Sequence, residues 1–193
     1  MKVYLIKASA GSDYSKYKAE TGGPPQNIFA AAAATPKWYG LDMVDETIGM
    51  KADLATDAQL IVIFMSTPDA YRAYDLAKTY RAKGKLVVLG GLHTKFNQDE
   101  AAEHADAIII GEVENYWLEL LNHAEFGTLK LKYESEEPVA LSQLNPYPTD
   151  IISPSTYHYT WSVVVTRGCP FKCNFCLVPR FFNKFETRPI SHI

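Results

Sequence analysis

The apolar run at residues 59–65, QLIVIFM, most constrains the fold of this chain. After its first residue the run has no polar side chain, so both faces of a strand formed here must be covered. A helix pattern follows directly, with Thr67 as its N-cap, Pro68 at its first position and Gly84 just past its end. This stretch therefore predicts one strand-helix unit in the middle of a parallel sheet.

The same alternation recurs about five times before residue 135. Apolar strands alternating with helices predict right-handed crossovers and a parallel sheet with helices on both faces. The predicted fold class is α/β, a doubly wound parallel sheet of about five strands that is flavodoxin-like. The expected strands are 3–6, 41–44, 59–65, 85–89 and 106–110, with an edge strand at 129–133. The other expected helices are 26–35, 97–104 and 113–124.

Small residues follow four of these strands. In doubly wound sheets, ligands bind beyond the carboxyl ends of the strands, so these positions are candidates for a pocket. The other interpretation is that tight turns need small residues whatever they bind. Neither G-x-G-x-x-G nor G-x-x-x-x-G-K-[ST] occurs, so nucleotide phosphate binding by those loops is not indicated. The candidate positions are 8–12, Ser66, Thr67, Gly90, Gly91 and Gly111.

The character of the chain changes after residue 135. We expect a first domain at 1–135, a linker at 136–158 stiffened by Pro146 and Pro148, and the start of a second domain at 159–193. A strand expected at 161–166 runs straight into Arg167 and Cys169. The strand would thus deliver the loop that carries the cysteines.

Composition excludes several classes of protein. The formal net charge of -3 gives no general attraction to nucleic acid or anionic lipid, so we expect no nucleic-acid partner. No apolar run approaches the roughly 20 residues of a membrane span, and no signal peptide precedes the first strand, which predicts a cytoplasmic protein. The three cysteines are an odd number, which argues against a disulfide framework.

All three cysteines lie within eight residues, as C-x-x-x-C-x-x-C from Cys169 through Cys173 to Cys176. Three thiolates on so short a loop can converge on one inorganic centre, each holding one iron of a four-iron cluster. One iron would then lack a protein ligand, which is the open position a catalytic metal site requires. Arg167, Lys172 and Arg180 would soften the thiolate charge.

Zinc is the alternative centre for this loop. Cys3His is a known zinc set, and His158 or His192 could supply the fourth ligand. Zinc loops usually pair cysteines on two separate knuckles, however, and here all three lie on one. Three unrelated buried cysteines are a further alternative.

The stretch from Cys169 to Cys176, CPFKCNFC, resembles the signature of the radical S-adenosylmethionine (SAM) superfamily, in which an aromatic residue precedes the third cysteine. The resemblance implies that Cys169, Cys173 and Cys176 hold a four-iron four-sulfur (4Fe-4S) cluster and that Phe175 lies at the SAM site. SAM would bind the open iron, and its reductive cleavage would give a 5'-deoxyadenosyl radical that abstracts a hydrogen from the substrate. The resemblance also implies an electron donor such as a flavodoxin or ferredoxin, and a small-molecule or peptide substrate.

Three upstream segments, 66–68, 89–93 and 110–112, resemble parts of the cobalamin (vitamin B12)-binding domain that precedes the barrel in one branch of this superfamily. This resemblance implies a corrin over the strand ends and C-methylation as one possible reaction. A non-catalytic zinc module, or a radical SAM protein whose upstream domain binds no cobalamin, stays open as an alternative. The candidate cobalamin contacts are Ser66, Thr67, Gly90, Gly91, His93, Gly111 and Glu112.

Two departures from the family pattern stand out. The D-x-H-x-x-G motif of mutase-type cobalamin enzymes is absent, so no histidine from that motif ligates cobalt. The chain also ends seventeen residues after Cys176, whereas a (β/α)8 barrel takes roughly 200 residues or more. We therefore expect an N-terminal fragment of a longer enzyme, inactive by itself.

Overall fold

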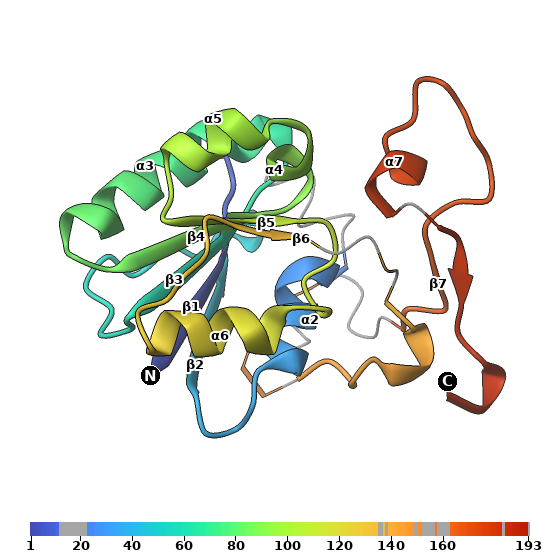
Figure 1. The fold of residues 1–193 in the computed structure, drawn as a ribbon, viewed down its shortest axis with the longest axis horizontal. Helices are drawn as coiled ribbons and strands as arrows, with labels where there is room; N and C mark the ends of the chain where they lie inside the picture. The colour runs from blue at the N-terminus through green and yellow to red at the C-terminus, as the bar shows by residue number, and fades with distance from the viewer. Residues whose placement is uncertain are drawn as a thin grey trace.

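A six-stranded parallel sheet forms the centre of the protein in a computed structural model of the chain (Figure 1). The structure describes residues 1–11, 23–134, 137, 139–148, 150–151, 157, 163–182 and 184–192. The strand order is β2-β1-β3-β4-β5-β6, which extends the flavodoxin-like order and confirms the predicted doubly wound class. The strands are β1 (Lys2–Lys7), β2 (Gly40–Asp45), β3 (Leu60–Phe64), β4 (Leu86–Gly90), β5 (Ala107–Ile110) and β6 (Lys132–Glu134).

Helices cover both faces of this sheet (Figure 1). α2 (Gln26–Ala34) and α6 (Trp117–Glu125) pack on one face. The other face carries α3 (Ala70–Ala82) and α5 (Gln98–Glu103), with the short α4 (Leu92–Phe96) at the carboxyl end of β4. Single 3-10 turns are η1 (Glu46–Ile48), η2 (Thr67–Asp69) and η3 (Leu141–Gln143).

Strand β3 shows why an apolar run lies in the middle of the sheet. Leu60, Val62 and Phe64 pack into the core under α2 and α6. Ile61 and Ile63 pack into the opposite core, under α3 and α5. All five side chains are buried, and each such burial stabilises the fold by about 1.5–3 kcal/mol. β3 lies between β1 and β4, and helices cover both of its faces, so neither face is open to water.

Several predicted helix bounds need correction. Thr67 does not cap α3, because η2 precedes that helix and the Thr67 hydroxyl lies 3.3 Å from Nδ1 of His93 instead. The five-residue α4 was not predicted, because it is too short to show a helical period. The helix expected from residue 113 begins only at Trp117, since Tyr116 has a non-helical backbone and its hydroxyl donates to the carbonyl of Ile110.

The sheet has six strands, against the predicted five or so with an edge strand. The additional strand is β6, the edge strand expected at 129–133, and it pairs in parallel with β5. Its start is three residues later than predicted, and Leu131 before it is exposed. Among the described residues, no helix is long and apolar enough to cross a bilayer.

The cysteine-bearing segment packs beside the carboxyl ends of the strands (Figure 1). It contains β7 (Thr166–Arg167), α7 (Val178–Phe182), β8 (Glu186–Thr187) and η5 (Ile190–His192). The strand expected at 161–166 has the wrong bounds, because the observed strand β7 begins only at Thr166. Residues 163–165 are not a strand, and 161–162 lie outside the described residues. The chain passes from β7 through Gly168 into the cysteine loop, and β7 pairs with the antiparallel β8.

Candidate functional site at the carboxyl ends of the strands

A small cavity of about 60 Å³ lies at the carboxyl ends of β3, β4 and β5. Three of the residues predicted to contact a cofactor line it: Gly91, Gly111 and Glu112. The remaining wall comes from α2, from Arg167 beside the cysteine loop, and from two phenylalanines of α7. The structure thus brings the predicted strand-end residues and the cysteine segment to one place. Phe64 at the end of β3 and Val113 after β5 also line the cavity, together with Asn27 and Ala30 of α2 and Phe181 and Phe182 of α7.

Two glycines of this site are required by the backbone itself. Gly91 has φ 108° and ψ -169°, a region that only glycine adopts readily. A Cβ on Gly91 would overlap with the carbonyl oxygen of Met65. Gly111 has φ 85° and open space around it, with Lys95 Nζ the nearest atom at 3.8 Å from a Cβ built there. The conformation of these turns therefore accounts for both glycines without a ligand.

The predicted polar contacts Ser66, Thr67 and His93 bond within the protein. The Ser66 hydroxyl donates to the carboxylate of Asp69. The ring of His93 is buried, and its Nε2 lies 3.1 Å from the hydroxyl of Tyr74 while its Nδ1 faces Thr67. None of the three lines the cavity. Their role at a cofactor stays a prediction.

A buried cluster of ions joins this edge of the sheet to the cysteine loop. Nη1 of Arg167 lies 2.6 Å from Oε1 of Glu112 and 2.8 Å from Oε1 of Glu114. Burial alone would lower the pKa of Arg167, but the two carboxylates more than offset it and raise that pKa. Burial raises the pKa of Glu112, with Arg167 opposing the shift. Arg167 was predicted to soften thiolate charge, and the structure commits its guanidinium to these carboxylates.

Lys95 on α4 is a site residue that the sequence did not reveal. Its ammonium donates to the carbonyl of Phe181 at 2.9 Å and lies 5.6 Å from the centre of the Phe181 ring. Burial lowers the pKa of Lys95, although Glu134 and Glu112 oppose that effect. The lysine therefore holds α7 over the cavity. A basic residue shortly after the Gly90-Gly91 turn was the only signal that could have drawn attention to it.

The three cysteines are free thiols on an accessible loop. Cys173 is exposed, Cys169 and Cys176 are half-buried, and a turn forms where the Cys176 amide donates to the carbonyl of Cys173 at 3.1 Å. Phe175 is 91% exposed, so one face of its ring is open to a ligand. In the part of the chain that the structure describes, no three His, Cys, Asp or Glu side chains are arranged to hold a metal ion.

The donor chemistry of the loop fits an iron-sulfur cluster better than zinc. Three thiols on one short, accessible loop match the three-thiolate set, while the loop must close further to bring them together. Of the two histidines considered for zinc, His158 lies outside the described residues and His192 falls in η5. A corrin does not fit the strand-end cavity as it stands. Ligand pockets usually measure about 300–1,000 Å³, whereas this cavity measures about 60 Å³, and α7 and Arg167 form part of its wall.

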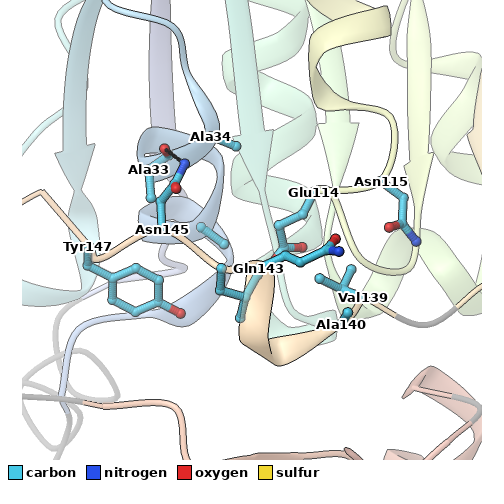
Figure 2. A pocket seen from close by; sticks show the side chains of 11 residues that line it. Ala33, Ala34, Glu114, Asn115, Val139, Ala140, Gln143, Asn145 and Tyr147 are labelled. Atoms are coloured by element: carbon cyan, nitrogen blue, oxygen red, sulfur yellow. Dashed lines mark hydrogen bonds between the residues drawn. The ribbon is translucent and has the colours of Figure 1, made fainter. Parts of the chain in front are cut away.

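A second cavity, of about 230 Å³, lies between α2 and the connector after β6 (Figure 2). Its wall is apolar along Ala30, Ala33 and Ala34, and polar along the connector, where the Asn145 amide donates to the Ala33 carbonyl. The hydroxyl of Tyr147 is buried and has no hydrogen-bond partner among the described residues. None of the residues predicted for a cofactor lines this cavity.

The fold and site together define an α/β protein with a doubly wound parallel sheet and a three-cysteine loop at its carboxyl edge. No family model matches the chain. The chain is 37% identical over 156 residues to the bacteriochlorophyllide d C-8(2)-methyltransferase of Chlorobaculum tepidum, which covers 78% of this chain and 35% of that protein. It is 29% identical over 174 residues to the bacteriochlorophyllide d C-12(1)-methyltransferase of the same organism. That alignment covers 86% of this chain and 38% of the methyltransferase.

A third relative has a different transfer reaction in its name. The chain is 30% identical over 126 residues to the ribosomal protein uS12 methylthiotransferase RimO of Desulforamulus reducens, covering 62% of this chain and 27% of that protein. The chain spans about a third of the length of the two methyltransferases. By their names, these relatives transfer methyl or methylthio groups.

Proposed function

We propose that this chain is the cluster-bearing part of a radical SAM methyltransferase, with a 4Fe-4S cluster on Cys169, Cys173 and Cys176. The observation that carries the proposal is the set of three free thiols on one accessible loop at the carboxyl edge of a doubly wound sheet. A cluster held by these three cysteines would supply one-electron reduction of SAM, the chemistry on which radical SAM enzymes depend. The two bacteriochlorophyllide relatives support methyl transfer to a carbon atom of a chlorophyllide-type molecule.

The residues of the chain have three tasks in this proposal. The thiolates of Cys169, Cys173 and Cys176 would be the protein ligands of the cluster. The exposed ring of Phe175 offers SAM an apolar contact next to Cys176. The sheet edge gives the loop a rigid base, because the first cysteine follows the buried Arg167 by only two residues. A flavodoxin or ferredoxin as electron donor and a cytoplasmic location belong to the same proposal.

Cobalamin belongs to the proposal only on one condition. The predicted corrin site is the strand-end cavity, and α7 with its Lys95 contact must leave that cavity before a large ligand enters. Titration of hydroxocobalamin into the chain, followed by its visible spectrum, tests this part separately. Absence of a spectral shift at high micromolar concentration would remove cobalamin and leave the cluster proposal intact.

Anaerobic reconstitution with iron and sulfide tests the cluster. We expect about four irons per chain and a brown chromophore, both largely lost in Cys173→Ala. Asn174→Ala, one residue away on the same loop, is the matched control and should keep the iron. One tightly bound zinc with no response to iron would overturn the proposal in favour of a zinc module.

A methylthiotransferase is the second candidate function. The 30% identity to the uS12 methylthiotransferase supports it, although that alignment covers less of this chain than either methyltransferase alignment does. The cluster test does not separate the two reactions. Incubation of the whole enzyme with labelled SAM and a chlorophyllide, with mass analysis of the product, distinguishes a methyl from a methylthio addition.

A further inference from the structure

The ion cluster between the sheet and the cysteine segment is an unusual way to hold a surface loop. The side chains of Arg167, Glu112 and Glu114 are only 6%, 10% and 12% exposed. They are 53 and 55 residues apart in sequence, so the contact is tertiary and joins two separate parts of the chain. Surface ion pairs contribute little to stability, but removal of one partner from a buried pair leaves an uncompensated charge.

We propose that Glu112 and Glu114 act as a clamp on Arg167, which makes Arg167 a positioning residue for the cluster loop. This inference rests on the proposed function, because it concerns the loop that would hold the cluster. One nitrogen of the planar guanidinium, Nη1, contacts both carboxylates, and the rigid plane fixes where that nitrogen lies, whereas a lysine ammonium is carried on a flexible stem. The clamp therefore sets the direction in which the chain leaves the sheet toward Cys169.

The chain between the clamp and the first thiol is short and stiff. Only Gly168 separates Arg167 from Cys169, and consecutive Cα atoms are about 3.8 Å apart. Gly168 has φ 82°, and a Cβ on it would overlap with the carbonyl oxygen of Lys184. This close approach fixes the path of the chain from β7 to Cys169. Cys169 is thus the anchored thiol, whereas Cys173 and Cys176 lie on the outer part of the loop.

Both carboxylate oxygens of Glu112 take part in this arrangement. Its Oε1 accepts from Arg167 and its Oε2 accepts from the backbone amide of Val139 at 3.4 Å. The sequence predicted Glu112 as a cobalamin contact, which stays a prediction, because Glu112 also lines the strand-end cavity. Two weaker anchors support the same arrangement: Lys95 holds the Phe181 carbonyl, and Arg188 Nε donates to the Leu141 carbonyl at 3.0 Å.

The first test uses the chain without iron. Tryptic cleavage in residues 163–192, where Arg180 and Lys184 are exposed, should be at least tenfold faster in the Glu112→Gln/Glu114→Gln double variant. Glu119→Gln on α6 is the control, because it makes the same Glu→Gln change at one exposed carboxylate and should not change the rate. Circular dichroism of each variant shows that the sheet domain is still folded.

The second test uses the reconstituted chain. Arg167→Lys keeps the charge but replaces the planar guanidinium by an ammonium on a flexible stem, and we expect its iron content to fall below half that of the unsubstituted chain. The electron paramagnetic resonance signal of the remaining reduced cluster should broaden as the loop adopts several positions. Equal cleavage rates, or an unchanged iron content and signal in Arg167→Lys, would overturn the positioning role. If the unsubstituted chain takes up no iron, the proposed function fails, and the cleavage test still decides whether the clamp holds the loop.

Discussion

Replacement of Gly91 by alanine tests whether the backbone, rather than a ligand, requires glycine at this position. Gly91 has φ 108° and ψ -169°, and for other residues this conformation costs about 1–3 kcal/mol. A Cβ there would also lie 3.0 Å from the Met65 nitrogen and 3.2 Å from its carbonyl carbon. The Met65 amide donates to the Gly90 carbonyl at 2.9 Å, so the strand cannot move away without losing a ladder bond.

The two costs together set the expected size of the effect. Overpacking of a rigid site costs about 1–3 kcal/mol, so the sum for Gly91→Ala is about 2–6 kcal/mol. Gly127→Ala is the control, because Gly127 has φ 68° and nothing within 4 Å of a built Cβ. Only the conformational cost of about 1–2 kcal/mol applies there.

Urea unfolding followed by circular dichroism at 222 nm measures both variants without any ligand. We expect Gly91→Ala to lower the free energy of unfolding by about 2–3 kcal/mol more than Gly127→Ala does, the difference between the middles of the two ranges, with an unchanged m-value. Equal losses in the two variants would refute the reasoning. Glycine at position 91 would then have to be explained by a bound ligand.

Two further predictions concern buried carboxylates. Burial alone would raise the pKa of Asp69, but Lys7 and the hydrogen bonds from Ser66 and Lys7 outweigh it and hold that pKa below its ordinary value. The stabilisation is therefore present above about pH 4 and is lost as the pH falls through the lowered pKa of Asp69. In urea unfolding, Asp69→Asn should lower the free energy of unfolding by about 3–5 kcal/mol at pH 7 and by clearly less at pH 3. The hydroxyl of Tyr157 donates to Oδ2 of the fully buried Asp45 at 2.9 Å. Tyr157→Phe should lower the free energy of unfolding by about 1.5–3 kcal/mol, and a loss under 0.5 kcal/mol would show that this connector contact does not stabilise the fold.

The sheet could be predicted from the sequence because its signals are local. The run at β3 is apolar on both faces, and a strand of that kind has few places to lie in an α/β protein. The turn after β4 was visible as Gly90-Gly91, although the reason for Gly91 lies in the backbone of Met65 on a neighbouring strand. Short elements were missed, since the five residues of α4 are too few to show a period.

The candidate site could be predicted only in part, because its contacts join distant residues. The cysteines and Phe175 form one local motif, so their grouping was visible in the sequence. Nothing in the spacing of Glu112 and Arg167 predicts an ion pair across 55 residues. The position of α7 over the strand ends likewise depends on Lys95, whose partner is a backbone carbonyl.

The strand order has a consequence for how the protein is made. Strand β1 becomes an interior strand once β2 and β3 have emerged from the ribosome, and every later strand up to β6 adds at one growing edge in the order of synthesis. Each new strand thus finds its neighbour in the sheet already synthesised. The cysteine segment is translated after all six strands of the sheet, so its thiols emerge when the sheet edge that carries Glu112 is already complete.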